Sequence, residues 1–230
     1  MRKRFILSFA SIVFLSSCTL ISYTPRVSLD VSPVTINRSL QVEKFEDLSP
    51  DDDREIATFG SSATNEAALA NDLNLELTRS IIDDFSSNYV FRSVGRKIEN
   101  PDFILKGKIK RFKAITRLTN YASVSLWLVP TSYVAALMIL NPLPLIALAP
   151  DVSLLCGAPA YVMRCEIELE ISIYDKNGNL LNTYTGQDKR ISRSDIYSNI
   201  NNGLPNQANR VLSKVVQQIR DQIVADVAKY

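Results

Sequence analysis

The sequence lacks histidine altogether and has little glycine or cysteine. Its 230 residues include no histidine, seven glycines and three cysteines. Without histidine, a chain cannot form a Ser-His-Asp or Cys-His nucleophile system or a histidine-ligated metal site. The glycine-rich phosphate-binding motifs G-x-G-x-x-G and G-x-x-x-x-G-K-[ST] do not occur. Asp83 and Asp84 are adjacent on an expected helix, where neighbouring side chains diverge, so they do not form an acid-base pair. We expect no catalytic residues, no metal and no cofactor.

An excess of charge of one sign is also lacking. The chain carries 26 Lys and Arg against 24 Asp and Glu. Residues 1–17 hold three of the basic residues and no acid, so their removal leaves 23 against 24. A protein that binds nucleic acid by neutralising phosphates needs a clear basic excess. We therefore expect no nucleic-acid partner, whereas the hydrophobic fraction of 46% is ample for a folded core.

The N-terminus is typical of a bacterial lipoprotein signal. Three basic residues precede an apolar run of about a dozen residues, which is too short for a spanning helix of about 20. The next residues, Leu15, Ser16, Ser17 and Cys18, resemble the bacterial lipobox at all four positions. This resemblance implies cleavage before Cys18, acylation of its thiol and its new amino group, and anchoring in membrane lipid. The alternative is an ordinary secretory signal with an incidental cysteine.

The resemblance also implies a location. Thr19 follows the cysteine, and the lack of an aspartate there favours the outer membrane over the inner one. We therefore expect a signal peptide at 1–17, a lipidated tether at 18–25, and a single domain at 26–230 that faces the periplasm. In that oxidising compartment Cys156 and Cys165 form a candidate disulfide, and two free, buried thiols are the alternative.

Hydrophobic periodicity predicts an α+β domain. Both expected helices have one apolar stripe, and the two clearest strands have one apolar and one charged face. We expect a two-layer sandwich, with two helices on one face of a mostly antiparallel or mixed sheet. The expected strands cover residues 27–32, 40–45, 89–94, 102–112, 165–174 and 180–187, and the expected helices cover residues 64–85 and 205–229.

Opposite charges line the outer faces of the two clearest strands. Glu166, Glu168 and Glu170 alternate along one strand, and lysines alternate along the other. If the strands pair, each cross-strand ion pair contributes about 0.2–1 kcal/mol. The same basic residues are candidate contacts for anionic headgroups, and a solvated sheet face is the alternative. This basic cluster comprises Lys106, Lys108, Lys110, Arg111, Lys113 and Arg117.

A long apolar insertion separates these strands. Residues 118–163 contain a single charged residue, Asp151, and several prolines interrupt any spanning helix. The large apolar side chains need burial, either on the domain's own sheet or as a hairpin-like insertion into the bilayer or a partner's groove. The candidate membrane or partner contacts are Trp127, Leu128, Tyr133, Leu137, Leu140, Leu143 and Leu145.

The lipobox and this order of elements resemble a group of outer-membrane lipoproteins with small periplasmic α/β domains. The group includes lipopolysaccharide-assembly lipoproteins, activators of cell-wall synthases, auxiliary lipoproteins of lipid-transport ABC systems and amyloid-secretion lipoproteins. The shared pattern is an amphipathic helix, a short strand, and a strand like residues 101–107. The resemblance implies a non-enzymatic accessory or assembly factor of an envelope transport or biogenesis complex, with an envelope protein as partner. The alternative is a lipid-binding lipoprotein that uses the insertion and the basic cluster.

Overall fold

The computed structural model describes residues 19–53, 67–70, 72–125 and 153–226. The predicted signal peptide, Cys18 and all candidate contacts between Trp127 and Leu145 lie outside these ranges. The elements in chain order are β1 (Thr19–Ser22), β2 (Ile36–Val42), β3 (Glu46–Asp47), η1 (Asp51–Asp53), β4 (Ala67–Ala70), α2 (Leu73–Ser87), β5 (Phe91–Gly95), β6 (Phe103–Leu118), β7 (Tyr161–Asp175), β8 (Leu180–Ser194) and α5 (Ile200–Ala225).

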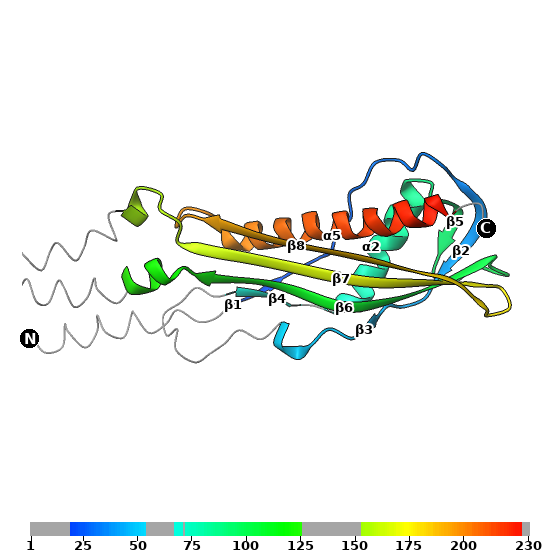
Figure 1. Cartoon of the computed structure of the whole chain (residues 1–230), viewed down its shortest axis with the longest axis horizontal. Coiled ribbons are helices and arrows are strands. Elements are labelled where there is room, and N and C mark those ends of the chain that lie inside the picture. Colours follow the sequence, from blue (N-terminus) through cyan, green and yellow to red (C-terminus); the bar gives the residue numbers. More distant parts are fainter. Residues whose placement is uncertain (1–18, 54–66, 71, 126–152, 227–230) are drawn as a thin grey trace, which may run out of the picture.

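All of these strands belong to one mixed sheet organised around β6 (Figure 1). One edge of β6 pairs with β7 in antiparallel fashion along its whole length, and β8 continues the ribbon. The other edge is shared by β2, β3 and β4, which pair with successive parts of β6. At the two ends of that edge, β5 extends β2 and β1 extends β4 in parallel.

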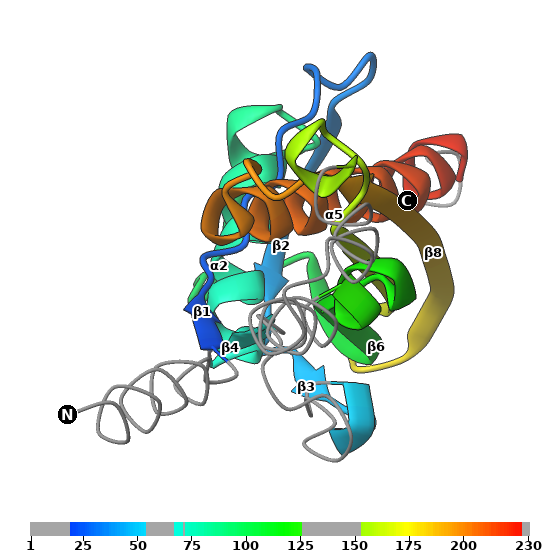
Figure 2. The same ribbon diagram turned by 90° about the vertical axis from the view of Figure 1, so that its left-hand side faces the viewer.

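The α+β class and the mixed sheet are confirmed, but the sheet is curled into a half-barrel and is not a flat layer. Figure 2 shows β8 bending around one side of α5. The apolar faces of β6 and β7 point inward, where side chains such as Leu105, Ile109 and Leu169 are fully buried. The apolar stripes of α2 and α5, including Ile81 and Val215, join the same core. Burying these stripes against the sheet is what stabilises both helices.

The predicted strand at 27–32 is wrong. Residues 27–30 alternate between half-buried and exposed, but the segment runs unpaired against the two helices. The Val27 N–H donates to Ser80 Oγ of α2 (3.0 Å), and Arg220 of α5 donates to the Asp30 carbonyl (2.6 Å). Helix side chains therefore satisfy backbone groups that a strand would satisfy by pairing.

Several predicted boundaries are also wrong. The helix expected from residue 64 begins at Leu73, and β4 occupies part of its predicted range. Alanine favours helix, but β4 pairs with both β1 and β6, so tertiary pairing overrides the local preference. The second helix begins at Ile200, with Pro205 inside it, because Asn199 acts as the N-cap and accepts from the Asn201 N–H.

Candidate functional site at the insertion end of the sheet

Three parts of the chain meet at one end of the sheet, which we call the insertion end. Thr19 of β1 pairs with Ala67 of β4, which in turn pairs with Thr116 of β6. The apolar insertion leaves the sheet two residues later, after Leu118, and returns at Tyr161, its partner in the register. The predicted lipidation site Cys18 directly precedes Thr19. The register therefore places the start of β1 and both ends of the insertion at the same end of the molecule.

The first and last residues of the insertion both lie beyond the same end of β6 and β7 (Figure 1), where they are hydrogen-bonded to each other. We call residues 119–125 and 153–160 the stems. The Thr119 N–H donates to the Ala160 carbonyl (2.8 Å), and the hydroxyls of Tyr121 and Ser153 are hydrogen-bonded. The stems also bury a small apolar cluster of their own. The insertion thus begins and ends on a defined platform, and residues 126–152 between the stems lie outside the described ranges.

Large hydrophobic side chains are exposed around this platform. Tyr197 and Leu155 are 67% and 61% exposed. A group of exposed apolar side chains on one surface usually marks a membrane or protein interface, and tyrosine is enriched where membranes meet water. In the described part of the chain this exposed apolar patch comprises Tyr121, Val124, Leu155, Ile191, Ile196 and Tyr197.

Five of the six residues in the predicted basic cluster are ion-paired. Strands β6 and β7 pair as the charge rows predicted, and Lys108 and Lys110 both contact Glu170, at 3.7 and 3.2 Å. Lys106 contacts Glu43 at 3.6 Å. A bulge at Lys110 shifts the register by one residue, so that both lysines reach the same carboxylate. These contacts favour the solvated, internally neutralised sheet face over a headgroup site along this stretch.

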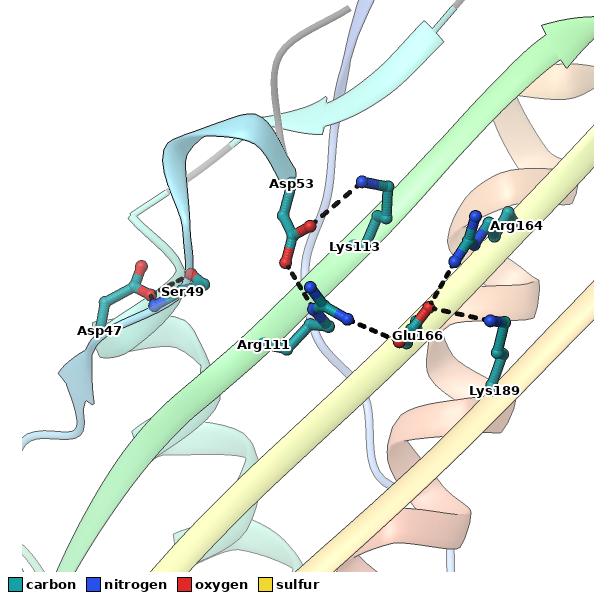
Figure 3. A network of polar contacts seen from close by, with 8 residues as sticks. All are labelled: Asp47, Ser49, Asp53, Arg111, Lys113, Arg164, Glu166 and Lys189. Carbon is teal, nitrogen blue, oxygen red and sulfur yellow. Dashed lines mark hydrogen bonds and ion pairs between the residues drawn. The ribbon is translucent and has the colours of Figure 1, made fainter.

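Asp53 at the end of η1 neutralises the next two cations. Its carboxylate, which is 2% exposed, accepts from Arg111 Nε and from Lys113 Nζ, each at 3.1 Å (Figure 3). The short helix η1 is therefore docked on the sheet. A buried carboxylate without its cations would be costly, so these two contacts fix η1 against β6.

Glu166 of β7 is the centre of the same network. It contacts Arg111 at 2.8 Å, Arg164 at 2.9 Å and Lys189 at 3.4 Å (Figure 3). Hydrogen bonds from Arg164 and Arg111, together with Lys189, lower the pKa of Glu166 to about 2. The pKa of Arg111 is raised in turn, because Arg111 donates a hydrogen bond to Glu166 and lies beside the carboxylate of Asp53. The network is structural, because Glu166 joins cations of β6, β7 and β8 and Asp53 joins η1 to two cations of β6.

Arg117 differs from the rest of the basic cluster. In the described ranges it has no ion pair, and it lines a cleft of about 680 Å³ on the outer face of the insertion end. In the register, Arg117 and Arg193 flank Val162 from the two neighbouring strands. Arg164 also lines the cleft. The described lining contains three arginines and no acidic residue, over an apolar floor that includes Ile115 and Val162.

Sequence reasoning identified only one of these three arginines. Arg164 and Arg193 lie on separate strands, and only the pairing of β6, β7 and β8 brings them beside Arg117. The Asn-Gly turn that joins β7 to β8 was the available signal, because it sets the register of the hairpin. Within the described ranges, no group of three or more Cys, Asp or Glu side chains is placed to bind a metal ion, and no helix is long and apolar enough to cross a membrane.

The candidate disulfide between Cys156 and Cys165 is absent, because both thiols are free. Cys165 lies four residues into β7, about 13 Å along the strand from Tyr161, whereas Cys156 is exposed in a stem beyond the start of that strand. A disulfide needs Cα atoms within about 7 Å of each other. Burial raises the pKa of Cys165 to about 12, so of the two described cysteines Cys156 is the one with an accessible thiol.

Several solved structures are similar to this chain, among them the following two. The first is the crystal structure of protein XCC0632 from Xanthomonas campestris, of family DUF330, with a TM-score of 0.51 and 15% identity over 90% of this chain and 95% of that one. The second is a PelC dodecamer from Paraburkholderia phytofirmans, with a TM-score of 0.38 and 8% identity over 84% and 93% of the two chains. No protein-family model and no curated protein matches the sequence. The similarity to the DUF330 protein shows a shared fold.

Proposed function

We propose that this protein is a lipid-anchored, non-enzymatic accessory factor whose insertion end faces the outer membrane from the periplasmic side. The observation that supports this most directly is the register that brings Thr19 level with Thr116. Acyl chains on Cys18 would then enter the bilayer beside the stems. Two or more chains give stable anchoring, since each buried methylene contributes about 0.8 kcal/mol.

The exposed apolar patch supports the same orientation. Tyr197 and Leu155 would lie in the interfacial region, and the uncharged residues 121–150 would find an apolar environment in the bilayer or in an envelope protein. We propose that residues 126–152 and this patch together contact the partner of an envelope transport or biogenesis complex. The ion-paired middle of the sheet would then act as the rigid body that carries this contact surface.

Fractionation of membranes tests the anchor. We expect Cys18→Ser to move the protein from the membrane fraction to the soluble fraction. If the variant stays in membranes through an alkaline wash, the acyl chains are not the anchor, and the proposed lipid anchoring through Cys18 is wrong.

Replacement of residues 126–152 by a short Gly/Ser linker tests the contact surface. Because Tyr121 and Ser153 are hydrogen-bonded, the stems lie close enough for such a linker, and we expect the domain to fold. Crosslinking in intact envelopes should then lose the partner, whereas the same linker at residues 176–179, in the opposite turn, should keep it. Unfolding of the first variant would show that the insertion is part of the core.

The structure weakens the alternative in which the basic cluster binds anionic lipid headgroups. Five of its six cations are within 4.0 Å of a carboxylate, so they have little free charge for lipid headgroups. Only Arg117 keeps that role, in the cleft that it shares with Arg164 and Arg193.

A further inference from the structure

We infer that the cleft at the insertion end binds the phosphate of an anionic membrane phospholipid, with Arg117 and Arg193 as its principal contacts. This inference rests on the proposed membrane anchoring, which would bring headgroups to this end of the sheet. The cleft would orient the domain at the bilayer surface. It would not serve as a transport cavity.

The charge of the cleft is the first argument. Arg117 on β6 and Arg193 on β8 flank Val162 of the intervening strand β7, and neither has an ion pair within the described ranges. In the middle of the sheet, by contrast, Asp53, Glu166 and Glu170 neutralise the cations. Two guanidinium groups in one cleft repel each other unless an anion lies between them, and arginine binds phosphate oxygens through two parallel hydrogen bonds.

The neighbouring arginine supplies a second argument. Arg164 donates to Glu166 through Nη2, but its Nε is buried without a hydrogen-bond partner in the part of the chain that the structure describes. A buried donor without a partner is costly. The cleft therefore borders a polar group that the described residues leave unsatisfied.

The floor of the cleft indicates a lipid in preference to a free anion. Ile115, which is 7% exposed, and the half-buried Val162 form an apolar surface under the arginines. The uncharged residues 121–150 cannot neutralise the guanidinium groups. An amphiphile with a phosphate and an apolar glycerol-ester portion matches both the charge and the floor.

Titration of the purified, full-length lipoprotein in an uncharged detergent tests this inference. The ligands are dihexanoyl-phosphatidylglycerol and inorganic phosphate, and the readout is calorimetry. We expect the lipid to bind at least about tenfold more tightly than phosphate, because only the lipid covers the apolar floor. Equal affinities for the two ligands would overturn the assignment to lipid.

Three variants locate the site. Arg117→Gln/Arg193→Gln should weaken lipid binding about tenfold or more, since it removes two charge-assisted contacts. Val162→Trp keeps all the charges but fills the floor, so it should weaken the lipid and spare inorganic phosphate. Arg92→Gln/Arg96→Gln removes two exposed arginines at the opposite end and should change nothing.

The outcomes separate this inference from the proposed function. Unchanged binding in the first variant, or an equal loss in the Arg92/Arg96 control, would overturn the cleft assignment, with thermal unfolding used to confirm that each variant is folded. Neither result would affect the Cys18→Ser fractionation. Conversely, a Cys18→Ser protein that is soluble and still binds the lipid would support the acyl anchor independently of the cleft.

Discussion

The middle of the sheet and its insertion end differ in how completely the chain satisfies its own groups. In the middle, Glu166 and Glu170 neutralise the cations of neighbouring strands. At the insertion end, Arg117 and Arg193 have no ion pair within the described ranges. Four side-chain atoms there are buried without a hydrogen-bond partner among the described residues: Thr116 Oγ1, Ser125 Oγ, Arg164 Nε and Ser194 Oγ.

Helix α5 covers the β8 edge of the sheet. In its middle, β8 exposes backbone groups that α5 satisfies: the Gln187 N–H donates to Gln218 Oε1 (3.0 Å), and Gln222 Nε2 donates to the Thr185 carbonyl (2.9 Å). These two glutamines protect an edge that could otherwise pair with another chain. Elsewhere in the described residues only Asp84 Oδ2 and Arg220 Nε, both on the helices, are buried without a hydrogen-bond partner. The unsatisfied side chains of the sheet itself therefore gather at the insertion end.

The largest expected effect compares one leucine from each region. Leu169→Ala removes a fully buried side chain from the middle of β7 and should lower the free energy of unfolding by about 2–5 kcal/mol. Leu155→Ala removes a side chain that is 61% exposed in a stem, and it should change stability by less than about 0.5 kcal/mol. Urea denaturation measures both values. Similar losses would show that the insertion end is core.

A second prediction adds volume to the middle. An added Cβ at Gly107 would lie 2.1 Å from Phe45 Cε1, and the Phe45 side chain is fully buried. Gly107→Ala should therefore destabilise the fold by about 1–3 kcal/mol through overpacking. The paired variant Gly107→Ala/Phe45→Leu should recover part of the loss, as urea denaturation would show. If Gly107→Ala alone has no effect, Phe45 does not pack tightly over Gly107.

The sequence predicted the middle of the molecule better than its ends. Local alternation identified the inward faces of β6 and β7, and the opposite charge rows predicted their pairing. At residues 27–32 the alternation of apolar and polar residues wrongly predicted a strand, because side chains of the two helices hydrogen-bond to the backbone there. Helix propensity misled at Ala67–Ala70, because only the pairing with β1 and β6 makes this segment a strand. The arginine cleft was missed because it needs the register of three strands at once.

A third prediction concerns pH. The pKa of Glu166 is about 2 in the folded protein, against an ordinary value of 4.5. A lowered pKa means that its ion pairs stabilise the fold fully above about pH 5 and lose this effect as the pH falls toward 2. Glu166→Gln should cost about 1–2 kcal/mol at pH 7, and the difference from the wild-type protein should shrink at pH 3. Urea denaturation at both values measures it.

Glu168→Gln is the matched control for this prediction. Glu168 is exposed on the same strand and has no ion pair within the described residues, so its loss should have little effect at either pH. An equal, pH-independent cost for both variants would mean that the network around Glu166 does not stabilise the fold.

The smallest expected effect concerns the protected edge. Gln218→Ala/Gln222→Ala removes both contacts to β8 and should cost about 1 kcal/mol or less in total, because each of these exposed hydrogen bonds contributes about 0.5 kcal/mol. The freed edge should also favour self-association, which light scattering coupled to size-exclusion chromatography would detect. Gln217→Ala, one position away on α5, serves as the control. A variant that stays as monodisperse as this control would show that these glutamines do not guard the edge.

The orientation at the membrane can be measured directly with the natural cysteines. Cys156 is exposed in a stem, and Cys165 is buried with a raised pKa, so a thiol-reactive fluorophore should label Cys156 alone. The lipidated protein in vesicles with brominated acyl chains should then show strong quenching. The variant Cys156→Ser/Asn177→Cys, labelled in the turn at the opposite end of the sheet, should show little. Equal quenching at both positions, or stronger quenching at position 177, would contradict an insertion end that faces the membrane.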